Sequence, residues 1–129
     1  MILGLCMIVK NEEHVIERAM RSALQTMDTF CIVDTGSTDR TKELIQKVSD
    51  ELNIKGFVYN RPWVNFGVNR TEALELARNH MDWAFMLDAD DILEGTIDNE
   101  LLKDDIGGYS IQLHEGSMIN NRTSLTNLI

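Results

Sequence analysis

Two aspartates, Asp88 and Asp90, follow an apolar run over residues 83–87 that has the length of a buried strand. Two carboxylates at the end of one strand repel each other unless a cation or a basic side chain lies between them. Carboxylate oxygens are ligands that suit Mg²⁺ and Mn²⁺. We therefore predict a divalent metal site at Asp88 and Asp90, with a solvated polar loop as the simpler alternative.

A second apolar run, residues 30–33, also ends in an acid, Asp34, which Thr35 and Gly36 follow. At a turn from strand to helix, Asp34 can accept hydrogen bonds from a base or a ribose, and Gly36 allows a ligand to approach the backbone closely. Residues 37–39, Ser-Thr-Asp, are also good helix-capping residues in any protein, so a structural role stays open. The two strands that end in acids together indicate a metal-assisted nucleotide site.

Other motifs for binding or catalysis fit the chain less well. A calcium loop beginning at Asp88 requires Gly and Glu where this chain has Leu93 and Asn99. The sequence contains no Gly-x-Gly-x-x-Gly and no Gly-Lys-Ser/Thr, which excludes the usual dinucleotide and P-loop sites. Phosphatases of the haloacid dehalogenase type also carry Asp-x-Asp after a strand. There the motif normally follows the first strand of the core, whereas several strand-like runs precede Asp88 here.

The hydrophobic pattern supplies a scaffold that brings these strand ends together. Apolar runs of strand length alternate with segments whose apolar residues repeat at helical spacing. The predicted strands are 1–9, 30–33, 57–59 and 83–87, and the predicted helices have inner faces over 15–24, 44–52 and 73–81. This alternation predicts an α/β fold, a parallel sheet covered by helices on both faces, with ligands beyond the carboxyl ends of the strands.

The pattern changes beyond the aspartate pair. Residues 108–113 alternate like a half-buried strand. Near the end of the chain, Leu125 and Leu128 are apolar with no following segment to bury them, so we interpret residues 1–129 as a single domain that is cut short. Apolar residues exposed at such an end would favour self-association.

Composition limits the class of protein. The 129 residues suffice for one core, and 43% hydrophobic with 26% charged residues is ordinary for a globular domain. The net charge of -9 excludes a nucleic-acid partner, because a phosphate backbone requires a basic surface. Cys6 and Cys31 lie within apolar runs and are interpreted as core residues in a reducing compartment. The apolar segment 1–9 lacks signal-peptide flanks and is too short to cross a bilayer, which predicts a cytoplasmic protein without a membrane span.

Four motifs occur in order along the chain. They are residues 7–13 (Met-Ile-Val-Lys-Asn-Glu-Glu), residues 32–41 (Ile-Val-Asp-Thr-Gly-Ser-Thr-Asp-Arg-Thr), the pair Asn69-Arg70, and residues 87–91 (Leu-Asp-Ala-Asp-Asp). Together they resemble the signatures of the family 2 glycosyltransferases with the GT-A fold. Four motifs in register are much rarer by chance than any one of them. The resemblance implies a GT-A fold, which is a mixed, mostly parallel sheet flanked by helices on both faces.

The resemblance also implies a role for each matching position. Arg70 would contact the base or the phosphates of a nucleotide-diphosphate sugar, Asp88 would lie beside the ribose and the metal, and Asp90 would be the main ligand of Mn²⁺ or Mg²⁺. The implied donor-binding residues are Val9, Lys10, Asn11, Glu12, Asp34, Thr35, Gly36, Arg70, Asp88, Ala89 and Asp90. A UDP-sugar is the favoured donor, although many members carry two consecutive acids where this chain has Asp34 and Thr35.

The activity implied by the resemblance is sugar transfer with inversion. The metal would stabilise the departing nucleoside diphosphate, and a carboxylate would deprotonate the acceptor hydroxyl. In similar proteins this base lies well beyond the Asp-x-Asp motif, so we expect it beyond Ile129, with Glu115 the weaker candidate within the chain. We interpret the chain as the donor-binding half of a glycosyltransferase. The alternative is a non-catalytic fragment that binds nucleotide sugars without the base.

Overall fold

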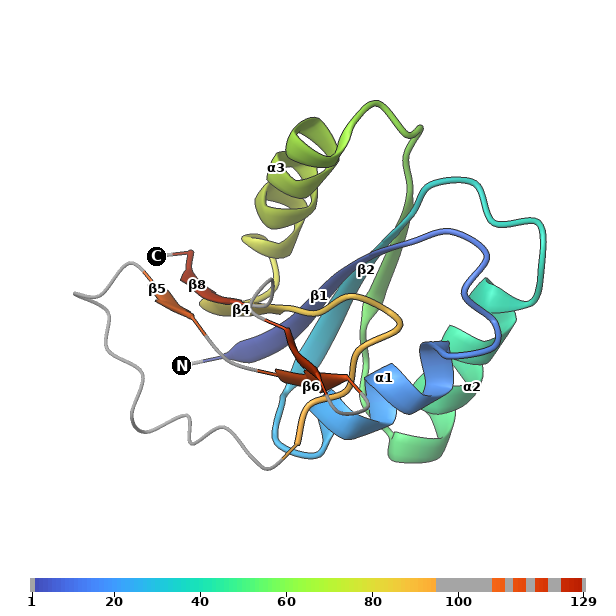
Figure 1. Cartoon of the computed structure of the whole chain (residues 1–129), viewed down its shortest axis with the longest axis horizontal. Helices are drawn as coiled ribbons and strands as arrows, with labels where there is room; N and C mark the ends of the chain where they lie inside the picture. Colours follow the sequence, from blue (N-terminus) through green and yellow to red (C-terminus); the bar gives the residue numbers. More distant parts are fainter. Residues whose placement is uncertain (1, 95–107, 111–112, 116–117, 121–123, 129) are drawn as a thin grey trace.

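The computed structural model describes residues 2–94, 108–110, 113–115, 118–120 and 124–128. Strands and helices alternate from β1 to β4, and short strands follow (Figure 1). In chain order the elements are β1 (Leu3–Val9), α1 (Ile16–Leu24), β2 (Thr29–Asp34), α2 (Thr41–Leu52), β3 (Phe57–Asn60), α3 (Phe66–Ala77), β4 (Trp83–Met86), β5 (Gly108–Ser110), β6 (Leu113–Glu115), β7 (Met118–Asn120) and β8 (Ser124–Asn127). Within these described ranges, no helix combines the length and the apolar composition needed to cross a membrane.

Six strands form one sheet in the order β3-β2-β1-β4-β8-β5. The strands β1 to β4 are parallel, whereas β8 pairs antiparallel with both β4 and β5. Strands β6 and β7 form a separate antiparallel pair. The sheet confirms the predicted mixed, mostly parallel α/β class. Because β1 lies between β2 and β4, the carboxyl ends of these strands meet at one edge, where open parallel sheets bind ligands.

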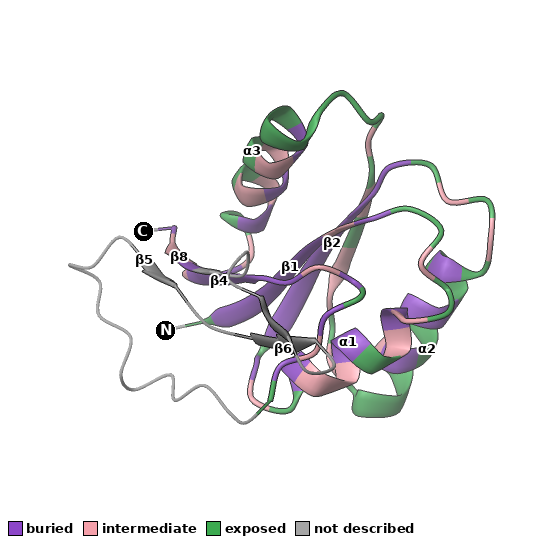
Figure 2. Cartoon of the chain, viewed as in Figure 1, coloured by how far each residue is buried: buried purple, intermediate pink, exposed green. Residues whose placement is uncertain are grey.

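Helices cover both faces of the sheet, with α3 on one face and α1 and α2 on the other (Figure 1). Successive side chains of β1 point to opposite faces. Leu5 and Met7 belong to the cluster under α1 and α2, whereas Cys6 belongs to the cluster with Ala73 and Ala77 of α3. Burial on both faces explains why the strands read as continuous apolar runs (Figure 2).

Cys6 and Cys31 are free and buried, as the sequence predicts. They are paired neighbours on β1 and β2. Burial raises the pKa of the Cys31 thiol to about 11. Burial raises the pKa of Cys6 even further above its usual value, and the nearby Cys31 adds to the effect. Both thiols therefore remain protonated at neutral pH.

Some sequence-based predictions about boundaries and burial are wrong. The single strand predicted over 108–113 is divided between β5 and β6, which belong to different sheets. Helix α3 ends at Ala77, before the predicted limit at Met81. Leu125 and Leu128 are only 4% and 6% exposed, because β8 inserts between β4 and β5. These two residues therefore do not supply the apolar surface on which the expectation of self-association rested.

Candidate functional site

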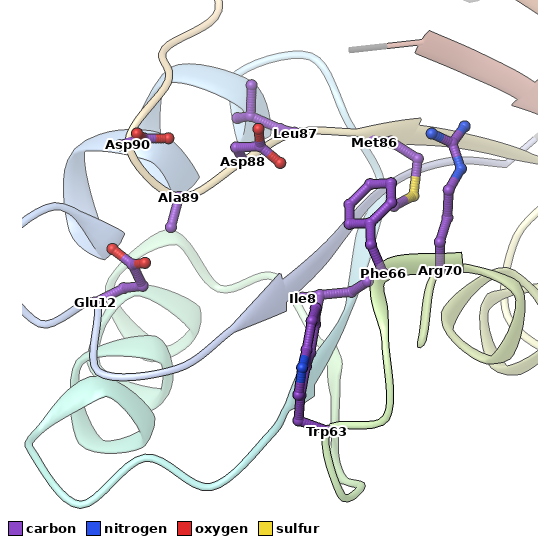
Figure 3. Close-up of a pocket in the computed structure, with 10 residues that line it drawn as sticks. All are labelled: Ile8, Glu12, Trp63, Phe66, Arg70, Met86, Leu87, Asp88, Ala89 and Asp90. Carbon is purple, nitrogen blue, oxygen red and sulfur yellow. The ribbon is translucent and has the colours of Figure 1, made fainter. Parts of the chain in front are cut away.

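A cleft of about 320 Å³ lies where β1 and β4 end, beside the start of α3 (Figure 3). Figure 3 shows Glu12 and Asp90 toward one end of this cleft and Arg70 at the other. The sequence-predicted residues that line the cleft are Glu12, Arg70, Asp88, Ala89 and Asp90. The lining residues that the sequence analysis did not identify are Ile8, Trp63, Phe66, Met86 and Leu87. The cleft therefore combines carboxylates, one guanidinium and two aromatic rings.

The predicted residues Asp34, Thr35 and Gly36 line a separate space, the second hollow, of about 400 Å³ at the ends of β2 and β3. Lys42, Asn60, Arg61 and Pro62 complete its lining. The chain runs from this hollow at Pro62 directly to the cleft at Trp63. The structure thus places eight of the eleven predicted donor-binding residues in two neighbouring spaces, five in the cleft and three in the second hollow.

Val9, Lys10 and Asn11 are not among the residues that line either space. Val9 is buried in the core, and its carbonyl accepts a hydrogen bond from the backbone N–H of Thr35 at 2.9 Å. Lys10 and Asn11 are exposed. Val9 and Asn11 therefore contact the loop after β2 through hydrogen bonds within the protein.

Asn11 joins the loop after β1 to the loop after β2. Its side-chain Oδ1 accepts hydrogen bonds from the backbone N–H groups of Thr38 at 2.8 Å and Asp39 at 3.3 Å. Its own backbone N–H donates to Ser37 Oγ at 2.9 Å. The residue adopts a φ of 52°, in the left-handed region that favours asparagine and glycine. Asn11 therefore holds the two loops at the sheet edge in a fixed relation.

We expect Asn11→Gly to destabilise the protein by roughly 1 kcal/mol, because the left-handed backbone is kept and the amide contacts are lost. Asn11→Ala should cost about 1–2 kcal/mol more, because alanine disfavours this conformation. Urea unfolding measures both values. Asn53 provides the matched control, since its φ is 54° and no side-chain hydrogen bond of Asn53 is found in the described part of the chain. If Asn11→Gly were no more destabilising than Asn53→Gly, the hydrogen bonds of the Asn11 side chain would not contribute measurably to stability.

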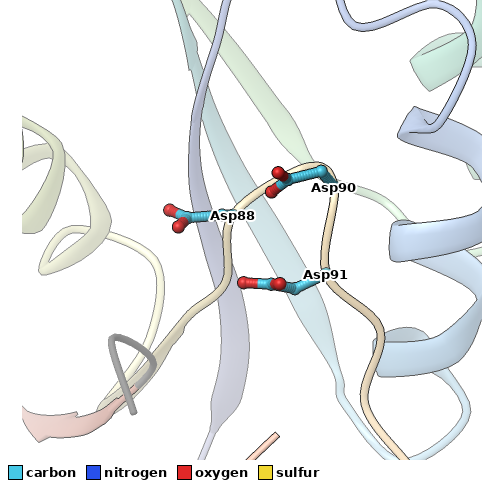
Figure 4. A group of neighbouring side chains, drawn as sticks. All are labelled: Asp88, Asp90 and Asp91. Atoms are coloured by element: carbon cyan, nitrogen blue, oxygen red, sulfur yellow. The ribbon is translucent and has the colours of Figure 1, made fainter. Parts of the chain in front are cut away.

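Three carboxylates gather on the loop after β4 (Figure 4). One oxygen from each of Asp88, Asp90 and Asp91 can be chosen so that all lie within 4.8 Å of one another. Asp91 is buried and donates its backbone N–H to the Asp88 carbonyl at 3.0 Å. Asp91 is not among the metal ligands predicted from the sequence, although its position directly after Asp88-Ala89-Asp90 was a usable signal. An all-carboxylate set of donors fits a hard divalent cation such as Mn²⁺ or Mg²⁺.

Helix α1 anchors the loop that carries these acids. The Arg18 guanidinium donates to the carbonyl oxygen of Asp90 at 3.0 Å. Ser22 Oγ accepts a hydrogen bond from the backbone N–H of Leu93, also at 3.0 Å. The loop is therefore attached to α1 on both sides of Asp91.

Negative charge accumulates at the acidic end of the cleft. Burial raises the pKa of Glu12 above its usual value, and the carboxylates of Asp90, Asp39 and Asp88 raise it further, while His14 acts in the opposite direction. A group of neighbouring carboxylates attracts a multivalent cation more strongly than any one of them. The electrostatics of the cleft therefore favour a bound divalent ion.

Solved structures with a similar fold are GT-A glycosyltransferases. TarS of S. aureus matches with a TM-score of 0.59 and 23% identity, over 71% of this chain and 28% of that chain. The mannosyltransferase PcManGT of Pyrobaculum calidifontis, solved with GDP-Man and Mn²⁺, matches with a TM-score of 0.57 and 18% identity, over 72% of this chain and 28% of that chain. Glucosyl-3-phosphoglycerate synthase of Mycobacterium tuberculosis, solved with Mn²⁺ and UDP, has a TM-score of 0.52 and 22% identity, over 70% of this chain and 34% of that chain. The fold is thus that of a GT-A glycosyltransferase.

Sequence comparison identifies the family. The profile of glycosyl transferase family 2 matches residues 5–103, and the chain therefore belongs to this family. A TPR repeat-containing protein of Synechococcus elongatus is 32% identical over 92 residues, which is 70% of this chain and 21% of that protein. The lipopolysaccharide core biosynthesis glycosyltransferase LpsC of Rhizobium meliloti is 32% identical over 115 residues, 84% of this chain and 41% of LpsC. The chain thus matches about a fifth to two-fifths of the length of these relatives.

Proposed function

We propose that this chain binds a nucleotide-diphosphate sugar, preferably a UDP-sugar, as the donor-binding portion of a metal-dependent, inverting glycosyltransferase. The observation that carries the proposal is the group of carboxylates Asp88, Asp90 and Asp91, two of which line the same cleft as Arg70. Several carboxylates with only one arginine would repel a negatively charged diphosphate, so such a site binds a diphosphate only together with a cation. The complexes of the similar solved proteins with UDP, GDP-Man and Mn²⁺ support this choice of ligand.

The residues of the cleft would divide the work of binding. Asp88 and Asp90 would hold the cation, and the nearby Asp91 would add negative charge to the cation site. The Arg70 guanidinium would bind phosphate oxygens with charge-assisted hydrogen bonds. When bound, Mn²⁺ or Mg²⁺ neutralises negative charge on the departing diphosphate. The chain's own contribution is to place the carboxylates directly after the buried strand β4 and Arg70 in the first turns of α3, so that these side chains need little reorganisation.

The preference for uridine is inferred from Asp34. Its Oδ1 accepts hydrogen bonds from the backbone N–H groups of Gly36 at 2.9 Å and Ser37 at 2.7 Å. Its Oδ2 is buried and has no hydrogen-bond partner in the described part of the chain. This remaining acceptor would match the single N3–H on the edge of uracil once the adjoining loop shifts to admit the base. Guanine presents two neighbouring donors, N1–H and the N2 amino group, and pairs best with both oxygens of a carboxylate, whereas Oδ1 of Asp34 is already engaged by Gly36 and Ser37.

The proposed reaction also requires a carboxylate that deprotonates the acceptor hydroxyl. Glu115 falls in β6, where side chains lie outside the described part of the structure. We expect the base outside the described region, in line with the short fraction of each relative that the chain matches. The alternative function, a binding unit that lacks the base, shares the same donor site.

Calorimetric titration with UDP-glucose and UDP-GlcNAc tests the donor site, with Mn²⁺ and with EDTA. We expect binding with Mn²⁺ and a loss of at least about tenfold in affinity with EDTA. Binding that is absent, or equal in both conditions, would contradict the proposal. Release of free UDP in the presence of an acceptor then distinguishes the two alternatives, because a chain without the base binds donor but does not transfer sugar.

A further inference from the structure

Trp63 is a large aromatic residue held at the surface by a buried amide. It is 54% exposed and lines the cleft, as does Phe66 at 56% exposed. The Asn69 side chain, which is fully buried, accepts a hydrogen bond from Val64 N–H at 2.8 Å and donates one to the Pro62 carbonyl at 3.0 Å. These two bonds fix the backbone on both sides of Trp63. The exposure of its ring is therefore a property of an anchored loop.

The loop that carries Trp63 starts directly beside Asp34. The backbone N–H of Arg61 donates to the Asp34 carbonyl oxygen at 3.0 Å. Trp63 follows Arg61 by two residues, and two residues span at most about 7 Å. A pyrimidine ring whose edge meets Asp34 therefore lies within reach of the Trp63 side chain.

The order of groups in a nucleotide sugar decides which part Trp63 would meet. The diphosphate separates the base from the sugar, and the cation site at Asp88 and Asp90 is where the diphosphate would bind. The base would extend from there toward Asp34 and would pass Trp63 and Phe66. These two side chains line the cleft (Figure 3). A flat aromatic face matches a nucleobase, because bases stack on aromatic rings largely without regard to their edges.

We propose that Trp63, together with Phe66, is a stacking platform for the base of the donor nucleotide. The proposal rests on the proposed function and adds a determinant of base binding formed by the loop between β3 and α3 and by the first residue of α3. Asn69 acts as a positioning residue, since its amide holds the loop and does not line the cleft. Asp34 would distinguish bases by a hydrogen bond to the base edge, whereas Trp63 and Phe66 would stack on the face of the base.

The test compares a ligand with a base and a ligand without one. Calorimetry measures the affinity of wild-type protein, Trp63→Ala and Trp63→Phe for UDP and for pyrophosphate, all with Mn²⁺. We expect Trp63→Ala to weaken UDP binding by roughly 5- to 100-fold and to leave pyrophosphate binding unchanged. Trp63→Phe should retain most of the affinity. Val64→Ala is the matched control, because Val64 is 58% exposed on the same loop and is not among the cleft-lining residues.

Tryptophan fluorescence gives an independent measurement on the wild-type chain. The sequence has two tryptophans, and Trp83 is fully buried. UDP should therefore protect the emission of Trp63 from quenching by acrylamide, and pyrophosphate should not. Unchanged UDP affinity in Trp63→Ala would contradict the role of Trp63 in stacking. An equal loss of affinity for UDP and for pyrophosphate would contradict it too. Neither outcome would contradict the proposed donor site. Failure of the folded wild-type protein to bind UDP with Mn²⁺ would instead reject the proposed function itself.

Discussion

Asp90→Ala is expected to abolish Mn²⁺-dependent binding of UDP while the protein remains folded. The change removes one of three carboxylates whose oxygens lie close enough to share a cation, and we expect a loss of roughly 100-fold or more in affinity. The Asp90 side chain is exposed, so unfolding free energy should change by less than about 0.5 kcal/mol. The bond from Arg18 goes to the backbone carbonyl of Asp90 and survives the substitution. Calorimetry with UDP and Mn²⁺ measures the binding, and urea unfolding measures the stability.

Glu94→Ala is a charge-matched control for this experiment. Glu94 is an exposed acid on the same segment, and it is not part of the group formed by Asp88, Asp90 and Asp91. Its replacement removes the same net charge and should leave Mn²⁺-dependent binding within about twofold, since Glu94 is exposed and outside the group, and salt screens its charge. Equal losses in Asp90→Ala and Glu94→Ala would show a general charge effect. Unchanged binding in Asp90→Ala would remove this residue from the site.

Asp34→Asn is expected to reduce UDP affinity and to raise affinity for CDP. The amide oxygen can still accept the N–H groups of Gly36 and Ser37, which keeps the turn. The amide nitrogen replaces the buried acceptor Oδ2 by a donor. That donor opposes the N3–H of uracil and matches the N3 acceptor of cytosine. Loss of one charge-assisted hydrogen bond predicts a decrease of roughly 10- to 100-fold for UDP, measured by calorimetry with Mn²⁺.

The reciprocal change in base preference makes this prediction specific. A variant that is merely less stable would lose affinity for both nucleotides, and its urea unfolding midpoint would fall. Asp50→Asn, on the exposed surface of α2, makes the same chemical change away from both spaces and should alter neither affinity. A parallel loss for UDP and CDP in a stable Asp34→Asn protein would exclude Asp34 from contact with the base edge.

Much of the fold could be predicted from local patterns. Buried parallel strands read as continuous apolar runs and surface helices as residues repeating every three or four positions, so β1, β2, β4 and the three helices were found with small errors at their ends. The position of Asp34 directly after one run and of Asp88 and Asp90 after another also followed from the sequence. The short strands after β4 were not predicted correctly, because three or four residues carry too little periodicity to separate a strand from a loop.

The sequence by itself determined the class of fold and the acids at the strand ends, since both depend on residues close together in the chain. Only the tertiary structure decided that β8 buries Leu125, that Asp91 joins the acidic group, and that Asn11 binds a neighbouring loop. It also decided that Asn69 holds Trp63 at the surface beside the cleft. These outcomes depend on strand order and on hydrogen bonds between separate loops. No local spacing encodes them, because a side chain's partner is set by which elements pack together.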